Sequence, residues 1–244
     1  MEKKFLEDTK KTLRKYMWAK KFYKFSKRVI KPFFIYKTFN STKPISNVYG
    51  TDRGQSIDRF YIENFLKNNS SIIKGRTLEI LDNKYTKNFG DKKVIQSDVL
   101  DIDKKNSDAN IIADLRNMPE IKENTYDCII LTQVLQFIDN LDQVISECHR
   151  ILKPGGYILA TMPSLSRIDC AAGIENDFWR FTQASAKYIF AKKFNDIVIK
   201  TYGNSRVGAC FLYGASVEDT PLRVLKKNDN QFPVVITVKA RKHD

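Results

Sequence analysis

The chain has 244 residues and a mass of 28.3 kDa, which suits one sizeable α/β domain with an appendage. Hydrophobic residues make up 42% and charged residues 29%, with 10 Gly and 7 Pro, so collagen-like, low-complexity and wholly disordered proteins are excluded. No apolar run approaches the roughly 18 residues of a membrane-spanning helix, and the N-terminus lacks the apolar core of a secretory signal. We therefore expect a globular cytoplasmic protein.

Most of the net charge of +14 lies at the N-terminus, where residues 1–43 hold 14 Lys or Arg against three acids. Trp18, Phe22, Phe25 and Val29 recur at helical spacing there, with lysines on the remaining faces, and Pro32 ends the pattern. The sequence thus predicts a basic amphipathic helical extension over residues 1–47, followed by a domain over 48–244.

Three roles are compatible with this extension. Its apolar stripe can pack on the main domain or on a second subunit. Residues 14–39 can instead lie on an anionic membrane surface, which would place the protein peripherally at the inner membrane face. Contact with nucleic-acid phosphates is the least favoured role, and the oligomeric state stays open.

Helices and strands alternate along the rest of the chain. Ser56 can cap a helix with an apolar face on Ile57, Tyr61 and Phe65. The later elements are strands over 77–81, 93–96 (running into Asp98), 109–113 and 127–131, a helix over 141–152 closed by a Lys-Pro-Gly-Gly turn, and a strand over 157–162. This alternation predicts a parallel, doubly wound sheet.

Ligands of such sheets bind beyond the carboxyl ends of the strands, where the strand order reverses. The expected strand ends carry Asp82, Asp98, Asp114 and the pair Thr132-Gln133. An acid-bearing rim of this kind suits a ribose diol, an amine donor and a positive centre better than it suits a pyrophosphate. The four cysteines, Cys128, Cys148, Cys170 and Cys210, form no Cys-x-x-Cys pair, so we expect free thiols and no metal site.

These residues resemble the class I S-adenosylmethionine-dependent methyltransferases, especially the small ones found in bacterial surface-polysaccharide clusters. The resemblance runs from Arg53 to the C-terminus. It rests on the segments 53–63, 75–90, 112–115, 126–133, 150–156 and 179–182. It implies a Rossmann-like seven-stranded sheet of order 3-2-1-4-5-7-6 with an antiparallel last strand, the final two strands being 197–201 and 233–239.

The resemblance also implies binding roles for the cofactor S-adenosylmethionine. Glu79 would hold the methionine ammonium, Asp98 the ribose hydroxyls, and Asp114 with Leu115 the adenine. Thr132 and Gln133 would line the cleft after the fourth strand. The family places glycine after the Glu79-Ile80 pair, whereas this chain has Leu81, whose side chain either crowds the methionine portion or forces the loop outward.

For the acceptor, the resemblance points to the loop after strand five. Asp177 is the candidate general base, Trp179 can stack on a sugar, and Arg180 can bind a phosphate or carboxylate. Arg53 and Tyr61 are further substrate-binding candidates in a segment that covers the cofactor.

The sequence is thus interpreted as a methyltransferase acting on oxygen of a sugar, a nucleotide sugar or a lipid-linked glycan intermediate. Two alternatives stay open. The first is a methyltransferase-like binding module that has lost catalysis, which Leu81 favours. The second is a nucleic-acid methyltransferase, although the chain lacks the Asn/Asp-Pro-Pro-Tyr/Phe pattern after the fourth strand.

Overall fold

The computed structural model describes residues 41–243, so the helix expected within residues 1–40 lies outside the described part. The first described residues already pack on the domain: the Ile45 N–H donates to the Tyr213 carbonyl, and Ser46 is buried. Across residues 41–243, no helix combines the length and apolar character needed to cross a membrane.

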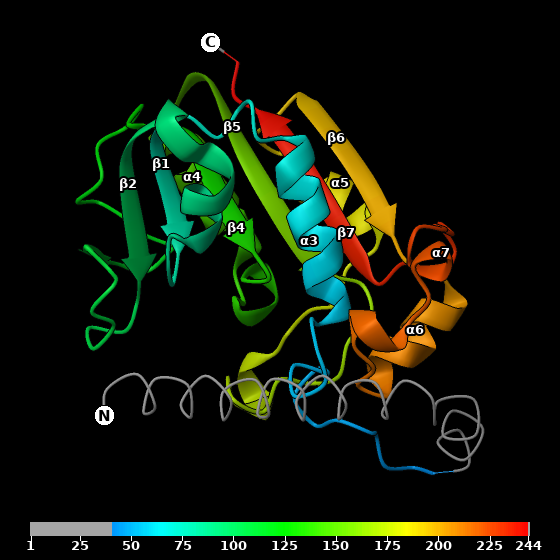
Figure 1. Ribbon diagram of the computed structural model, residues 1–244. Helices are drawn as coiled ribbons and strands as arrows, with labels where there is room; N and C mark the ends of the chain where they lie inside the picture. Colours follow the sequence, from blue (N-terminus) through cyan, green and yellow to red (C-terminus); the bar gives the residue numbers. More distant parts are fainter. Residues whose placement is uncertain (1–40, 244) are drawn as a thin grey trace, which may run out of the picture.

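Within the described residues, seven strands form one sheet in the order β3-β2-β1-β4-β5-β7-β6 (Figure 1). The strands are β1 (Gly75–Ile80), β2 (Val94–Asp101), β3 (Ile111–Ile112), β4 (Tyr126–Thr132), β5 (Leu152–Pro163), β6 (Asp196–Tyr202) and β7 (Val235–Arg241). β1 to β5 pair in parallel, and β7 runs antiparallel to both of its neighbours. The predicted doubly wound sheet with an antiparallel last strand is confirmed.

Helices cover both faces of the sheet. α3 (Ile57–Asn68), α6 (Ser205–Leu212) and α7 (Leu222–Leu225) contribute to the apolar cluster on one face, and α4 (Leu141–Ile151) and α5 (Gln183–Phe190) to that on the other (Figure 1). β4 shows the resulting alternation: Cys128 and Ile130 face the α3 side, while Ile129 and Leu131 face the α4 side, all fully buried. Burial on both faces explains why β4 is the most apolar strand in the sequence.

The start of β5 differs from the sequence prediction. α4 ends at Ile151, but the Lys-Pro-Gly-Gly segment after it belongs to β5, which begins at Leu152. Leu152 pairs with Tyr126, and a register shift before the pairing of Cys128 with Tyr157 accommodates the extra residues. A bulge of this kind lets the strand start earlier than its apolar run.

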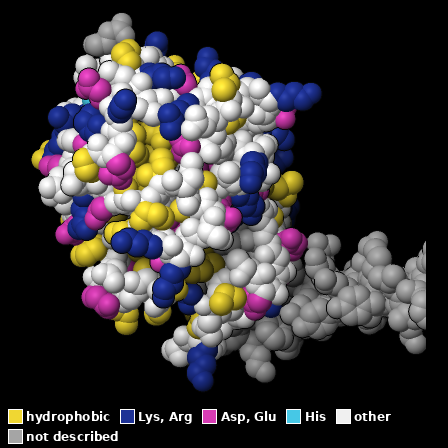
Figure 2. Space-filling model, turned by 90° about the vertical axis from the view of Figure 1, so that its left-hand side faces the viewer, with side chains coloured by type: hydrophobic (Ala, Val, Ile, Leu, Met, Phe, Trp, Pro, Cys, Tyr) yellow, Lys and Arg dark blue, Asp and Glu magenta, His cyan; other side chains and the backbone are white. Residues whose placement is uncertain are grey.

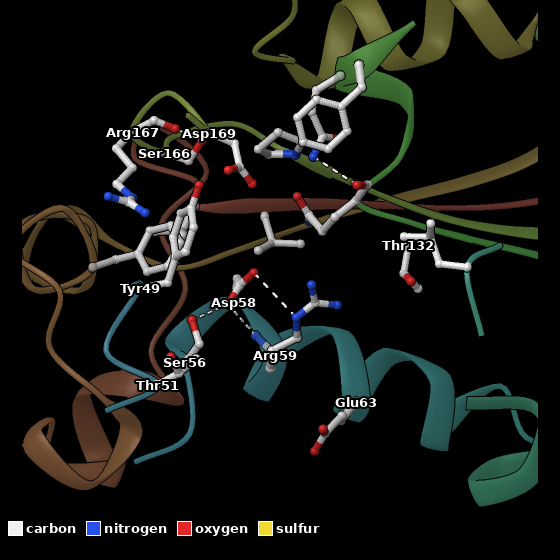
Figure 3. Close-up of a pocket in the computed structure, with 18 of the residues that line it drawn as sticks. Tyr49, Thr51, Ser56, Asp58, Arg59, Glu63, Thr132, Ser166, Arg167 and Asp169 are labelled. Carbon is white, nitrogen blue, oxygen red and sulfur yellow. Dashed lines mark hydrogen bonds and ion pairs between the residues drawn. The ribbon is translucent and has the colours of Figure 1, made fainter. Parts of the chain in front are cut away.

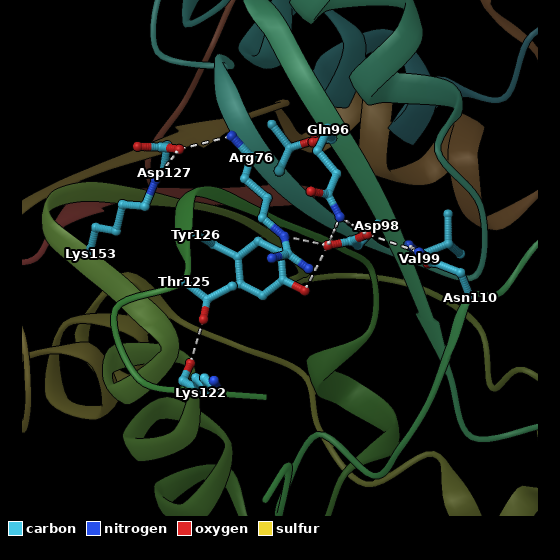
Figure 4. A network of polar contacts seen from close by, with 11 residues as sticks. Arg76, Gln96, Asp98, Val99, Asn110, Lys122, Thr125, Tyr126, Asp127 and Lys153 are labelled. Atoms are coloured by element: carbon cyan, nitrogen blue, oxygen red, sulfur yellow. Dashed lines mark hydrogen bonds and ion pairs between the residues drawn. The ribbon is translucent and has the colours of Figure 1, made fainter. Parts of the chain in front are cut away.

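The prediction that β2 ends at Asp98 is wrong, because the strand continues to Asp101. Asp98 pairs with Leu78 inside the sheet, and its carboxylate is buried (Figure 4). It accepts hydrogen bonds from Arg76 Nε at 2.7 Å, Asn110 Nδ2 at 2.8 Å, Gln96 Nε2 at 3.0 Å and the Tyr126 hydroxyl at 3.1 Å. Burial alone would raise the pKa of Asp98, but these donors outweigh it and lower the pKa below its ordinary value.

β3 has only two residues, which pair with Leu100 and Asp101. The outer edge of β2 before Leu100 therefore pairs with no other strand in the described part of the chain, and Ile95 on it is 89% exposed. Figure 2 shows this side of the molecule, where Lys and Arg side chains are interspersed with Asp and Glu. No single sign of charge dominates this face.

Asp98→Asn should lower the free energy of unfolding by about 3 kcal/mol at pH 7, because the buried carboxylate gives up its charge-assisted hydrogen bonds to four donors. The pKa of Asp98 is lower in the folded protein, so its contribution is present above its unfolded pKa and lost as the pH falls through the folded value. The difference between the two proteins should therefore shrink below about pH 4. Urea unfolding measures both effects, with exposed Asp108→Asn as the control; equal stabilities at pH 7 would contradict the network.

Candidate functional site

A cleft of about 590 Å³ opens at the carboxyl ends of β1, β4 and β5. This volume lies within the range of small-molecule sites. The first turns of α3 form one wall, and the loop after β5 forms another. In Figure 3, Asp58 and Arg59 point from α3 into the cavity, Tyr49, Arg167 and Asp169 gather at one end, and Thr132 lies at the other.

Glu79 forms part of the floor and holds the loop after β1. Its carboxylate is buried and accepts the backbone N–H groups of Tyr85 at 3.0 Å and Thr86 at 2.7 Å. These donors begin the short helical turn Thr86–Gly90. Burial raises the pKa of Glu79 to about 7, although the two hydrogen bonds oppose the shift. The predicted site residue therefore lies in the cleft, and a cation beside it would relieve the cost of its burial.

Leu81 and Gln133 adopt left-handed backbone conformations at the ends of two neighbouring strands. The φ angle of Leu81 is 74° and that of Gln133 is 55°. Leu81 thus adopts the conformation for which glycine is favoured, at a cost of roughly 1–2 kcal/mol. Its side chain is 56% exposed at the cleft, and its N–H donates to the Leu100 carbonyl. Such strain clusters at functional sites when the surroundings hold it in place.

Two side-chain amide atoms at the cleft lack hydrogen-bond partners among residues 41–243. They are Nε2 of Gln133, a donor, and Oε1 of Gln136, an acceptor. The Gln136 side chain is nearly fully buried and is oriented by its own Nε2, which donates to the Gln133 carbonyl at 2.9 Å. An unpaired buried polar atom is costly, so both atoms fit a ligand that supplies an acceptor and a donor.

The remaining predicted cofactor residues do not line the cleft. Asp98 lies inside the sheet, and Leu115 is buried in the core on the α4 side. Asp114 follows β3, where its carboxylate accepts hydrogen bonds from the Arg116 side chain and backbone. The Arg116 side chain lowers the pKa of Asp114, so this acid is ionised and already partnered. Of the predicted set, Glu79, Leu81, Thr132 and Gln133 are brought together.

Asp101 is a residue that sequence reasoning missed. It occupies the carboxyl end of β2, beside the loop that contains Leu81. Asn106 Nδ2 links the two segments by donating to the Leu81 carbonyl and to Asp101 Oδ2, each at 2.7 Å. In the sequence, the apolar pair Val99-Leu100 ahead of Asp101 indicates that the strand extends beyond Asp98.

The far end of the cleft carries several polar side chains. Asp177 and Arg180 both line it but bind each other through two hydrogen bonds, and the Asp177 carboxylate is buried. The Arg180 hydrogen bond lowers the pKa of Asp177, which makes it a weaker base than predicted. Asp169 also lines the cleft: its backbone N–H donates to the Asp177 carboxylate at 2.9 Å, its Oδ1 accepts the Ala171 N–H at 3.0 Å, and no Lys or Arg of residues 41–243 lies within salt-bridge distance of it. Burial raises the pKa of Tyr49, which therefore stays protonated as a donor.

Three predicted substrate residues lie elsewhere. Arg53 pairs with Asp219, with Nε and Oδ2 2.7 Å apart. Tyr61 is buried in the core, and its hydroxyl donates to the Leu225 carbonyl. Trp179 faces a separate groove. In residues 41–243, no three His, Cys, Asp or Glu side chains are grouped to hold a metal ion.

Residues 75–160 match a family model described as a methyltransferase domain. No curated protein matches the chain in sequence. Among solved structures, a SAM-dependent methyltransferase from Archaeoglobus fulgidus is 14% identical, with a TM-score of 0.52 and coverage of 75% of this chain and 94% of that one. A possible histamine N-methyltransferase from Thermotoga maritima is 16% identical, with a TM-score of 0.53 and coverage of 76% and 91%.

The N-methyltransferase NodS from Bradyrhizobium japonicum, in complex with S-adenosylhomocysteine, is 10% identical, with a TM-score of 0.51 and coverage of 82% of this chain and 94% of that one. These likenesses concern the fold. Residues 75–160 are thus similar in sequence to a methyltransferase domain, and the seven-stranded sheet has the Rossmann-like fold of these SAM-dependent methyltransferases of known structure.

Leu81→Gly should raise the free energy of unfolding by up to about 1 kcal/mol, because glycine removes the cost of the left-handed conformation and little buried surface is lost. Leu81→Ala is the matched control, since it removes the same side chain but keeps the backbone cost. Urea denaturation of the three proteins measures the effect. Equal stabilities of the glycine and alanine variants would show that this backbone is not strained.

Proposed function

We propose that this protein transfers a methyl group from S-adenosylmethionine to an oxygen atom of a sugar, a nucleotide sugar or a lipid-linked glycan intermediate. The observation that carries this proposal is the cleft at the carboxyl edge of the sheet, which joins the buried Glu79 carboxylate to the unpartnered amide atoms of Gln133 and Gln136. The choice of acceptor rests on the resemblance of the sequence.

The cleft residues fit this cofactor. Glu79 would stabilise its ammonium group, and Gln133 would supply a buried donor. Asp101 lies outside the cleft lining, beside the loop after β1, and would accept from the ribose hydroxyls once Asn106 releases it. Bound S-adenosylmethionine supplies a methyl group activated by a positively charged sulfur. The chain contributes orientation and exclusion of water, because α3 and the loop after β5 enclose the cleft. Asp169 then offers a carboxylate for the proton of the acceptor hydroxyl.

Calorimetric titration with S-adenosylhomocysteine tests the cofactor site without any acceptor. The unaltered protein should bind, and Asp101→Asn should weaken binding at least about tenfold, because the amide cannot accept two ribose hydrogen bonds equally well. Asp108→Asn, an exposed acid on the same loop, is the matched control and should bind normally. Absence of binding by the unaltered protein would overturn the proposed function.

The binding should also depend on pH. A ligand ammonium favours the ionised form of Glu79 and lowers its pKa, which is about 7 in the free protein. Binding at lower pH must therefore expel a proton, so affinity should fall as the pH drops from about 7.5 to 5.5. Titrations in buffers of different ionisation enthalpy count the released protons. Glu79→Gln should abolish both effects, and an unchanged proton release in that variant would assign the titration to another group.

A catalytically inactive binding module is the second candidate, and the leucine side chain at the cleft favours it. The titration with S-adenosylhomocysteine distinguishes the two candidates, since the enzyme should bind this ligand and the inactive module should not. The peripheral membrane role of residues 14–39 stays a proposal, because that segment lies outside the described residues. The loop after β4 does not support the nucleic-acid alternative, because its sequence, Gln133-Val134-Leu135, lacks the Asn/Asp-Pro-Pro-Tyr/Phe pattern.

A further inference from the structure

A second depression lies beside the cleft, between α4 and α5. This α4–α5 groove has a volume of about 510 Å³. Its lining includes Asp139, Asn140, Asp142, Trp179, Tyr188 and Lys192. The size fits a small ligand of several rings, whereas a stable protein partner needs about 800 Å² of surface on each side.

Two exposed aromatic side chains define the groove. Trp179 is 41% exposed and Tyr188 is 69% exposed. The Trp179 indole N–H donates to the Ile138 carbonyl at 2.8 Å, which fixes the orientation of the ring. Lys192 Nζ lies 4.6 Å from the centre of the Tyr188 ring and also binds the Asp142 carboxylate at 2.6 Å, so this second ring is likewise held. Trp179 therefore presents an oriented aromatic face to solvent, and Tyr188 presents the ring face that Lys192 does not cover.

The charges around these rings are neutralised in pairs. Asp139 binds Arg116 at 2.8 Å, Asp142 binds Lys192, and Arg180 binds Asp177. A strongly charged ligand would have to break one of these pairs. Hydrogen-bonding capacity remains: only Oδ1 of Asp139 is engaged within the described chain, and Asn140 uses its Oδ1 to cap α4, which leaves its Nδ2 available.

We propose that the α4–α5 groove binds an uncharged oligosaccharide. The apolar faces of its sugar rings stack on Trp179 and Tyr188, and its hydroxyls bond to Asp139 and Asn140. Arg180 lines both the groove and the cleft, so a bound glycan extends toward the cleft. The further step, that this glycan is the methyl acceptor, rests on the proposed function; the binding itself does not.

The test uses the full chain and an array of neutral oligosaccharides of three to six hexose or deoxyhexose units, followed by titration of each one retained. At least one should bind with a dissociation constant below about 10 mM. Trp179→Ala and Tyr188→Ala should each weaken that binding at least about tenfold. Phe178→Ala is the matched control, since this neighbouring aromatic is 47% exposed but lines neither the groove nor the cleft.

Asp101→Asn should leave oligosaccharide binding unchanged, which separates this proposal from the cofactor site. Retention of no neutral oligosaccharide would overturn the proposal. So would equal binding by the unaltered protein and both aromatic variants. Selective retention of peptides on a parallel peptide array, with no glycan bound, would assign the groove to a protein segment and overturn the proposal as well.

Discussion

The end of the cleft formed by the loop after β1 depends on one buried carboxylate, which holds that loop although residues 81–85 contain no glycine. Glu79 accepts the N–H groups of Tyr85 and Thr86, and this anchors the chain between β1 and the following helical turn. The anchor lets Leu81 keep a positive φ at a strand end. The same carboxylate is raised to a pKa of about 7 by its burial, so the group that orders the loop is also the one most sensitive to a nearby cation.

The alternation of helices and strands predicted a parallel, doubly wound sheet, because apolar patterns report burial, whereas the strand order came from the resemblance to a known family. The predicted end of β2 came too early, although the apolar pair Val99-Leu100 indicates that the strand continues. Asp98 looked like a terminal acid, yet its donors Arg76, Asn110 and Tyr126 lie 12 to 28 residues away along the chain. Partners at such separations are brought together only by the fold, so a polar residue inside a strand and one at its end look alike in sequence.

The same limit applies to the cleft. The family resemblance pointed to Glu79 within β1, to Leu81 after it, and to Thr132 and Gln133 at the end of β4, and the structure brings all four together at the cleft. Residue type alone did not show that Tyr61 and Arg53 have structural roles. A tyrosine on an apolar helix face can belong to the core, and an arginine in a turn can form an ion pair, as readily as either can bind a ligand. Asp177 lines the cleft, but its hydrogen bonds with Arg180 lower its pKa. The ion pair between Asp177 and Arg180 depends on side-chain geometry, which the spacing of residues in the sequence does not reveal.

The shortness of β3 has a consequence for solubility. It leaves backbone groups of β2 facing solvent next to the almost fully exposed Ile95, an arrangement that can recruit a strand from another molecule. Lys92 and Lys93 stand immediately before this strand. Repulsion between these lysines on different copies opposes edge-to-edge aggregation, so this pair of charges protects the folded chain.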